Sequence, residues 1–312
     1  MKVLVTGGCG YIGTNLIKKL LKDGYEVVVI DSQWFGNYLG NHKKLKIIKS
    51  DIRKIKLYKK HFKNTNTVIH LANIANDLSV ELEQNLSWET NVLSTMQLIE
   101  TCIENKVKKF IYASSGSVYG LKKEKKVTED LELTPISLYN KTKMISERVL
   151  MSYKNAIDIY CIRPATVCGV SPRMRLDLTV NVLTYNGTKN KKMDVFGGKQ
   201  IRPNIHINDM VGIYCFLLKN KIPTGIYNAG FENMSVISIA NLVSKITGAE
   251  INILKSNDPR SYRLDSSKIV KMGFKPKFSV EDGINDVIDF TKSTKILKSF
   301  FSVRWLKNLR IK

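Results

Sequence analysis

The chain has 312 residues, which suggests two domains or one large one. Hydrophobic residues make up 43% of the sequence, enough for a sizeable core, so disorder is excluded as the main state. The sequence contains no run of about 18 apolar residues, which excludes a membrane-spanning helix. Its first strand is followed at once by glycines, unlike a secretory signal. We therefore expect a cytoplasmic protein.

The formal net charge is +23, from 50 Lys and Arg residues against 27 Asp and Glu residues. Such a charge suits nucleic acid, an anionic membrane or anionic small molecules. The lysines are scattered, so we interpret the charge chiefly as a Lys-rich background and expect no nucleic-acid partner. The five cysteines are odd in number and show no Cys-x-x-Cys spacing, so we expect reduced thiols and no metal site.

Strands and helices are predicted to alternate in the first half of the chain. Residues 2–6, 14–22 and 26–30 make one strand–helix–strand unit. The same alternation continues with strands at 45–49, 67–70, 109–113 and 157–162, and with helices near 88–105 and 137–153. Continuous apolar strands of this kind predict an α/β fold with a doubly wound parallel sheet covered on both faces.

Prolines punctuate shorter elements after about residue 165, which indicates a change of domain. We expect residues 1–165 to form the doubly wound domain, with 205–220 returning to it. Residues 166–293 are predicted to form a smaller C-terminal α/β domain that binds substrate. The tail 294–312 is basic and amphipathic. It either docks as a helix on its own domain or a partner subunit, or makes a weak contact with an anionic membrane surface.

The segment after the first strand is rich in glycine and reads Gly7-Gly8-Cys9-Gly10-Tyr11-Ile12-Gly13. Gly7 permits a tight turn, Gly10 a close approach to a pyrophosphate, and Gly13 close packing of helix on strand. The second strand ends in Asp31, whose carboxylate can accept hydrogen bonds from adenosine ribose hydroxyls. Because no Arg or Lys follows Asp31 directly, we expect a Rossmann domain that binds NAD rather than NADP.

A second group of residues carries catalytic chemistry. Tyr139 and Lys143 are four residues apart and share one helix face. A neighbouring ammonium lowers the pKa of a phenol, so Tyr139 can act as a base. Ser115 follows an apolar strand, whose carboxyl end faces the ligand crevice in a doubly wound sheet. Ser115 can therefore hydrogen-bond a substrate hydroxyl and pass its proton to Tyr139.

In this order the motifs resemble the extended short-chain dehydrogenase/reductases, and within them the NAD-dependent sugar-nucleotide epimerases and dehydratases, closest in style to UDP-glucose 4-epimerases. The resemblance covers residues 1–290. It rests on the glycine segment, Asp31, Asp51-Ile52-Arg53, His70-Leu71-Ala72, Asn91, 114–120, Tyr139-x-x-x-Lys143 and 163–167.

The resemblance implies roles for particular residues. Ser115 matches the catalytic Ser/Thr, Tyr139 the base, and Lys143 the lysine that binds the cofactor ribose and tunes the pKa. The implied NAD site comprises Gly7, Gly10, Tyr11, Ile12, Gly13, Asp31, Asp51, Ile52, Leu71, Ala72, Asn91, Tyr139 and Lys143. Asp51 is equally interpretable as a helix N-cap, and Asn91 matches an asparagine that supports the active site.

The substrate side also follows from the resemblance. The implied substrate-binding residues are Ser115, Thr166, Asn181, Arg202 and Arg260. The arginines are suited to the diphosphate because a guanidinium binds phosphate oxygens bidentately. Thr166 departs from the family, which often has Asn there. Arg173 and Arg175 either contact an anionic or extended sugar or order their loop, and His206 is interpreted as structural.

At two positions the sequence departs from the pattern of related enzymes, which narrows the range of reactions that we expect. Dehydratases of this family follow the catalytic Thr with Asp-Glu, and decarboxylating relatives carry a Glu at the second of these positions. Here the positions hold Gly116 and Ser117, which cannot transfer protons in that way. We expect an NAD-dependent epimerase that oxidises C4 of a nucleotide-diphosphate sugar transiently to a ketone. The alternatives are a 4-dehydrogenase or dehydratase of the same fold and, in another class, a non-catalytic binding protein.

The resemblance carries two further expectations. Family members usually form homodimers through the two helices that flank the active site, here near 91–105 and 138–153. Sugar-nucleotide enzymes commonly feed the biosynthesis of surface polysaccharides.

Overall fold

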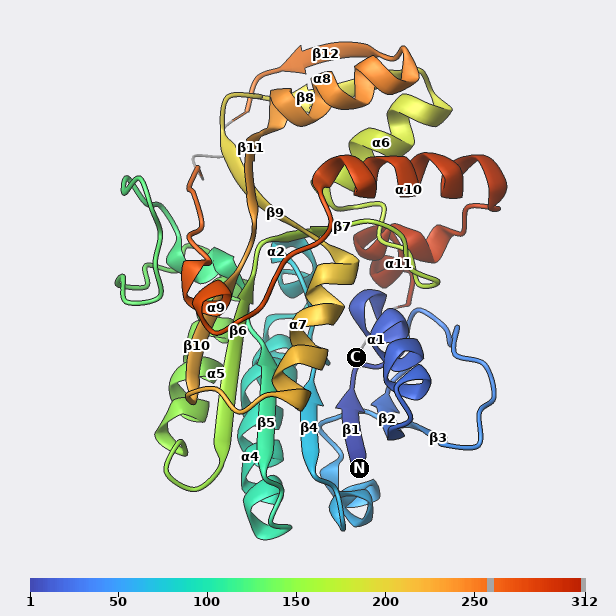
Figure 1. The fold of residues 1–312 in the computed structure, drawn as a ribbon. Coiled ribbons are helices and arrows are strands. Elements are labelled where there is room, and N and C mark those ends of the chain that lie inside the picture. Colours follow the sequence, from blue (N-terminus) through green and yellow to red (C-terminus); the bar gives the residue numbers. More distant parts are fainter. Residues whose placement is uncertain (257–260, 310–312) are drawn as a thin grey trace.

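A seven-stranded parallel sheet forms the lower half of the computed structural model, which describes residues 1–256 and 261–309 (Figure 1). The strand order is β10-β6-β5-β4-β1-β2-β3. The strands are β1 (Lys2–Thr6), β2 (Glu26–Asp31), β3 (Leu45–Lys49), β4 (Thr67–His70), β5 (Lys109–Ala113), β6 (Asp158–Pro164) and β10 (Gly225–Ala229). All neighbouring pairs are parallel, so the predicted doubly wound sheet is confirmed.

Two pairs of helices cover the sheet. Helices α1 (Tyr11–Lys22) and α7 (Ile207–Lys219) lie in front of it in Figure 1, and α4 (Ser94–Glu104) and α5 (Leu138–Ser152) lie behind it. Alternate residues of each strand enter the two layers. On β1, Val3 and Val5 join the core with α1 and α7, while Leu4 joins the core with α4 and α5. Both faces are therefore buried, as the continuous apolar strands predict.

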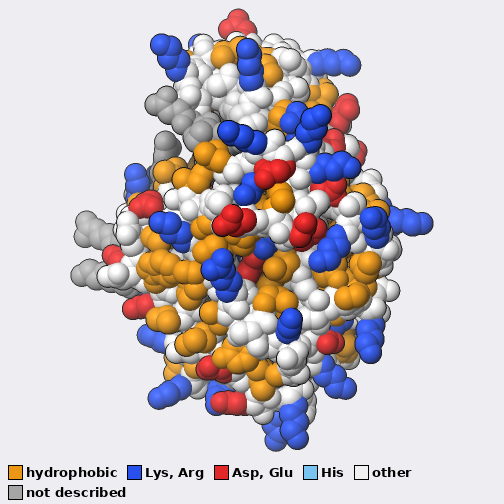
Figure 2. Space-filling view, turned by 90° about the vertical axis from the view of Figure 1, so that its left-hand side faces the viewer, with side chains coloured by type: hydrophobic (Ala, Val, Ile, Leu, Met, Phe, Trp, Pro, Cys, Tyr) orange, Lys and Arg blue, Asp and Glu red, His pale blue; other side chains and the backbone are white. Residues whose placement is uncertain are grey.

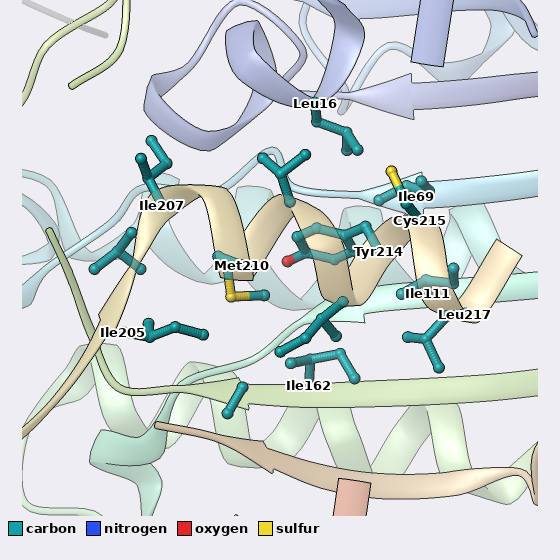
Figure 3. Packing of buried hydrophobic residues seen from close by; sticks show 14 of the residues in the cluster. Leu16, Ile69, Ile111, Ile162, Ile205, Ile207, Met210, Tyr214, Cys215 and Leu217 are labelled. Atoms are coloured by element: carbon teal, nitrogen blue, oxygen red, sulfur yellow. The ribbon is translucent and has the colours of Figure 1, made fainter. Parts of the chain in front are cut away.

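Helix α7 occupies the middle of the front layer. Met210, Tyr214 and Leu217 are fully buried on its inner side. Figure 3 shows these side chains among Ile111 and Ile162 of the strands. The segment 205–220 thus packs on the sheet. From its end the chain continues into β10, which belongs to the same sheet. Where the domains divide stays a prediction.

The upper half of the molecule has two small sheets and a third core. Strands β7 (Thr166–Cys168), β9 (Ile201–His206) and β11 (Glu232–Ser235) form one sheet, and β8 (Lys192–Phe196) and β12 (Glu250–Leu254) form the other. The helices α6 (Thr179–Lys189), α8 (Val236–Thr247) and α10 (Val280–Ser293) enclose the core between them. The short helix α9 (Ser267–Lys271) lies beside β10.

The predicted helix near 88–105 begins differently from an ordinary α-helix. Short helices α2 (Asp77–Val80) and α3 (Gln84–Trp88) lead into a π-helical turn at Glu89–Leu93, and α4 continues from it. Such turns are rare and are often found at functional sites. This one brings Asn91 under the loop that follows β4.

The basic tail docks on its own chain. It forms a 3-10 turn (Lys298–Phe300) and helix α11 (Ser302–Leu309). Phe300 and Leu306 are buried, and Phe300 packs near the rings of Tyr38 and Phe290. These two apolar side chains face inward, as the docking interpretation expects, whereas Leu297 is exposed. A membrane-surface contact of 294–312 stays a prediction. No helix in the described ranges is long and apolar enough to cross a membrane.

Positive charge is spread over one face of the molecule. Figure 2 shows Lys and Arg side chains over the whole height of one face, with hydrophobic side chains between them in the lower half. This face carries no continuous basic stripe, in agreement with a Lys-rich background.

A buried ion pair fixes the carboxyl ends of β5 and β6 to α5. Arg163 and Glu147 are each 2% exposed, and the guanidinium donates to both carboxylate oxygens at 2.6–3.2 Å. Arg163 also donates to the Tyr119 hydroxyl at 2.7 Å, and Ser114 donates to Glu147. A buried pair of this kind holds its groups in one geometry, and removal of one partner leaves an uncompensated charge.

We expect Glu147→Gln to lower the free energy of unfolding by about 3–5 kcal/mol, because Arg163 loses its only carboxylate partner in the described structure. Urea denaturation followed by circular dichroism measures this change. Glu104→Gln is the matched control, since Glu104 pairs with Lys59 in solvent and water screens that pair. Equal losses in the two variants would contradict the assigned importance of the buried pair.

Candidate active site

The glycine segment brings the start of α1 against β1 and the loop after β4. Gly7 has φ +74°, and a Cβ there would lie 2.5 Å from the backbone nitrogen of Ala72. A Cβ on Gly13 would lie 2.4 Å from the carbonyl oxygen of Gly7. Neither position admits a side chain. Gly10 caps α1 without a side-chain hydrogen bond, so N–H groups of the first turn remain free to receive an anion.

One end of the site is built around Asp31. Its carboxylate accepts hydrogen bonds from the backbone of Cys9 at 2.9 Å and of Gln33 at 2.7 Å. Burial raises the pKa of Asp31, and these two N–H groups oppose that rise. The cavity here is also lined by Asp51, Ile52, Leu71, Ala72, Trp34 and Phe35.

Asp51 has a partner inside the protein. The Arg53 side chain donates to it at 2.7 Å, and the Arg53 backbone N–H donates at 2.9 Å. Burial alone would raise the pKa of Asp51, but Arg53 outweighs it and the pKa lies below its usual range. Asp51 therefore lines the cavity and closes a local turn. The helix N-cap interpretation is wrong, because Lys54 is the N-cap of the 3-10 helix that follows.

The other end of the site brings Ser115, Tyr139 and Lys143 together. All three line one cavity of about 280 Å³, which Thr166 and Arg175 also line. Lys143 Nζ lies 5.9 Å from the centre of the Tyr139 ring and donates to the Ala113 carbonyl at 2.5 Å. The structure thus places the predicted base, its lysine and the serine at the carboxyl end of β5, as expected for a doubly wound sheet.

The polar groups behind Ser115 are ordered. Its hydroxyl lies 2.7 Å from that of Ser117, which donates to Asn140 Oδ1 at 2.6 Å. Gly116, between the two serines, meets the Pro164 carbonyl, where an added Cβ would lie at 3.1 Å. A side chain at 116 would therefore require its neighbours to shift by a few tenths of an ångström.

Burial sets the protonation of both titrating groups. It raises the pKa of Tyr139 to about 12, against the opposing effects of Arg175 and the Ser115 hydroxyl. Burial also lowers the pKa of Lys143 to about 7, against the opposing charge of Glu147. In the protein alone, burial thus outweighs any lowering of the phenol pKa by Lys143. A further positive charge is needed to produce it.

Three adjoining cavities that share lining residues form a trough between the two ends. Its middle section is lined by Gly7, Gly10 and Phe35 in common with the Asp31 end, and by Tyr11, Ile12 and Arg175 in common with the catalytic end. The trough runs along the glycine segment and the N-terminus of α1. A dinucleotide fits this arrangement, with adenosine at Asp31, the diphosphate at the helix N-terminus and the reactive ring beside Tyr139.

Two predicted contact residues lie behind the cavity rather than in it. Asn91 is fully buried and bonds the backbone of Ile74 and the Thr142 hydroxyl. Asn181 is also fully buried, and its amide bonds the Gly169 N–H and the Arg175 carbonyl. Direct binding of cofactor by Asn91 and of diphosphate by Asn181 is therefore wrong in this structure, because neither amide reaches the trough.

The remaining predicted residues differ in where they lie relative to the trough. The Tyr11 hydroxyl donates to the Gly169 carbonyl at 2.7 Å, so only the rest of this residue lines the trough. Arg202 lies on β9, and Arg260 lies outside the described residues. His206 is buried, stacks on Phe278 and lies 3.3 Å from Asp286, as expected for a structural histidine.

Several lining residues carried no sequence signal. Trp34, Phe35, Asn73 and Tyr262 all line the trough. They lie in loops, where hydrophobic periodicity says nothing about direction. Their one clue is an aromatic pair, Trp34 and Phe35, that begins three residues after Asp31.

We expect Lys143→Met to stabilise the unliganded protein near neutral pH. The unfolded chain holds a proton on Lys143 up to about pH 10.4, whereas the folded chain releases it near pH 7. The wild type therefore gains stability from Lys143 as pH rises from 7 towards 10. The advantage of the variant is largest below pH 7 and shrinks at higher pH. Thermal unfolding of both proteins at each pH measures this difference, and a constant difference would contradict it.

Comparisons with known proteins agree with this geometry. The model of the NAD dependent epimerase/dehydratase family matches residues 3–230. The chain is 31% identical to the uncharacterized UDP-glucose epimerase YtcB of Bacillus subtilis, over 94% of this chain and 98% of the relative.

Two solved structures are also similar. The UDP-glucuronic acid 4-epimerase of Bacillus cereus, in complex with UDP-glucuronic acid and NAD, is 30% identical with a TM-score of 0.83, over 94% of this chain and 99% of that one. The UDP-glucose 4-epimerase of Thermotoga maritima with UDP-glucose is 26% identical with a TM-score of 0.86, over the same shares.

Proposed function

This chain belongs to the NAD dependent epimerase/dehydratase family, and we propose that it is an NAD-dependent epimerase of nucleotide-diphosphate sugars that acts at C4. The observation that carries the proposal is the trough that starts at Asp31 and ends at Ser115, Tyr139 and Lys143. It provides a dinucleotide site and a base at the two ends of one cavity. A sugar alcohol beside Tyr139 then faces the reactive end of the cofactor.

The residues of the chain supply the proton chemistry. Tyr139 takes the proton of the C4 hydroxyl, directly or through Ser115, and returns a proton when the ketone is reduced. Lys143, held by the Ala113 carbonyl, binds the cofactor ribose and favours the phenolate. NAD held in the trough would supply the acceptor and donor of the C4 hydride, and its positive ring would supply the charge that lowers the Tyr139 pKa.

The side chains at positions 116 and 117, which are Asp-Glu in the dehydratases, favour epimerisation. Ser117 hydrogen-bonds Asn140, and Gly116 is packed against Pro164, so neither position offers a carboxylic acid. The 4-keto sugar is then left to rotate about its diphosphate linkage and to be reduced from the other face. The named relatives are UDP-sugar epimerases, so UDP-linked sugars are the first substrates to test.

The assembly and location are also part of the proposal. Helices α4 and α5 lie side by side behind the sheet, and half-buried apolar residues such as Met144 and Val149 on α5 and an exposed Leu93 beside α4 suit a homodimer interface. Light scattering of the purified protein tests the dimer. Five buried cysteines without disulfides support a cytoplasmic location. The substrate class supports a role in polysaccharide biosynthesis.

Tyr139→Phe is expected to lower turnover by about 100- to 10,000-fold, because the base is lost while the ring remains. NAD binding is expected to be unchanged, since the hydroxyl lies at the end of the trough. Steady-state kinetics and calorimetric titration with NAD measure the two quantities. Retained turnover in this variant would refute the base assignment.

Mass spectrometry of products from UDP-, GDP-, CDP- and dTDP-sugars distinguishes the reactions. We expect an isomer of unchanged mass that separates from the substrate by chromatography. A product that has lost two hydrogens would support a dehydrogenase, and one that has lost water would support a dehydratase. Binding without any product would support the non-catalytic alternative.

A further inference from the structure

Arg173 is a buried charge with no carboxylate partner among the described residues. It is 3% exposed. Its guanidinium donates to the Met174 carbonyl at 3.2 Å and to the Ser302 hydroxyl at 2.9 Å, and its Nε has no partner. A buried cation without an anion destabilises a fold. Arg163 and Arg175, by contrast, pair with Glu147 and Asp177.

The position of Arg173 indicates a binding function for this charge. Arg173 lines the middle section of the trough, together with Gly10, Ile12 and Gly13 at the start of α1. Its guanidinium stacks on the Phe35 ring, with 3.8 Å between the guanidinium carbon and the ring centre. Stacking fixes the plane of the fork and leaves its edge for hydrogen bonds.

We propose that Arg173 binds the diphosphate of the dinucleotide cofactor, across the trough from the N-terminus of α1. This assignment rests on the proposed function, because it takes NAD as the occupant of the trough. Asp177 and Asp31 act on Arg173 only at longer range. A diphosphate there would supply an anion in direct contact, and a guanidinium matches phosphate oxygens in geometry. The N–H groups of α1 would bind the same anion from the other side.

The sugar nucleotide also carries a diphosphate, so the two sources must be distinguished. Arg173 lines the middle section of the trough, which the glycine segment shares. It does not line the cavity that holds Ser115 and Tyr139, whereas Arg175 lines both. The position of Arg173 therefore favours the diphosphate of the cofactor over that of the substrate.

Helix α11 holds Arg173 in place. Ser302 accepts the Arg173 hydrogen bond and donates to Asp177 at 3.3 Å. Trp305 Nε1 donates to the Trp34 carbonyl at 2.7 Å, which ties the helix to the loop after β2. Ser302 is thus a positioning residue, in a segment beyond the residues 3–230 that the family model matches.

Calorimetric titration of the full-length protein tests the proposal with four ligands: NAD, ADP, adenosine and UDP. For Arg173→Met we expect affinity for NAD and ADP to fall by about tenfold to 100-fold, as for loss of a charged hydrogen bond. Affinity for adenosine and for UDP should be unchanged. Lys245→Met is the control for loss of one positive charge, since Lys245 is exposed on α8.

The outcomes separate the two proposals. A wild type that binds no NAD would refute the proposed function. A wild type that binds NAD, with an Arg173→Met variant that binds NAD and ADP equally well, would overturn only the role of Arg173. Weaker binding of UDP alone would also overturn it, because Arg173 would then serve the substrate. Arg173→Lys, which keeps the charge but loses the fork, is the second variant and should show a smaller loss on the same ligands.

Ser302→Ala tests the positioning role. It should lower the affinity for NAD and for ADP by about twofold to tenfold and leave the affinity for adenosine unchanged. In the Arg173→Met background the same change should have no further effect, because Ser302 acts only through Arg173. Additive losses would show that Ser302 does not act through Arg173. We expect the unliganded Arg173→Met protein to unfold at the same temperature as the wild type or at a higher one. Observation of this unfolding transition also shows that the variant is folded.

Discussion

The close approach of α1 to β1 determines where everything else in the site can lie. The Gly7 carbonyl leaves no room for a side chain on Gly13, and the backbone of Ala72 leaves none for a side chain on Gly7. It sets the amino end of a helix directly against the carboxyl ends of the central strands. Parallel pairing then brings the ends of β2 and β5 to the same edge. Asp31 and Ser115 therefore face one trough although they lie far apart in sequence.

The buried cationic side chains differ in whether a carboxylate lies within hydrogen-bonding distance. Arg163 has a carboxylate partner and holds the scaffold together. Lys143 and Arg173 have none within hydrogen-bonding distance among the described residues, and burial lowers the pKa of both, to about 7 and about 9. These two side chains lie along the trough. The fold thus keeps positive charge where an anionic dinucleotide and a developing phenolate would use it, at a cost in stability without ligand.

Local patterns in the sequence were enough to predict the fold and the two ends of the site. The glycine segment, Asp31, and the spacing of Tyr139 and Lys143 are short-range signals with direct physical meaning. Asn91 and Asn181 were misjudged as contacts because a motif cannot tell a residue that touches a ligand from one that holds up the loop beside it. The partnership of Arg173 with Ser302 joins residues 129 positions apart, and no local pattern encodes such a contact.

The π-helical turn at Glu89–Leu93 makes the architecture sensitive to chain length. Its geometry leaves the Asn91 carbonyl to accept hydroxyl hydrogens from Thr95 and Ser146, so α4, α5 and the loop at Ile74 are joined at one residue. Deletion of one residue within the turn would restore an ordinary α-helix. The residues before the deletion would then be rotated by about 100° about the helix axis, relative to α4. The Asn91 amide would then point away from Ile74. This segment should therefore tolerate substitutions more readily than changes in the number of its residues.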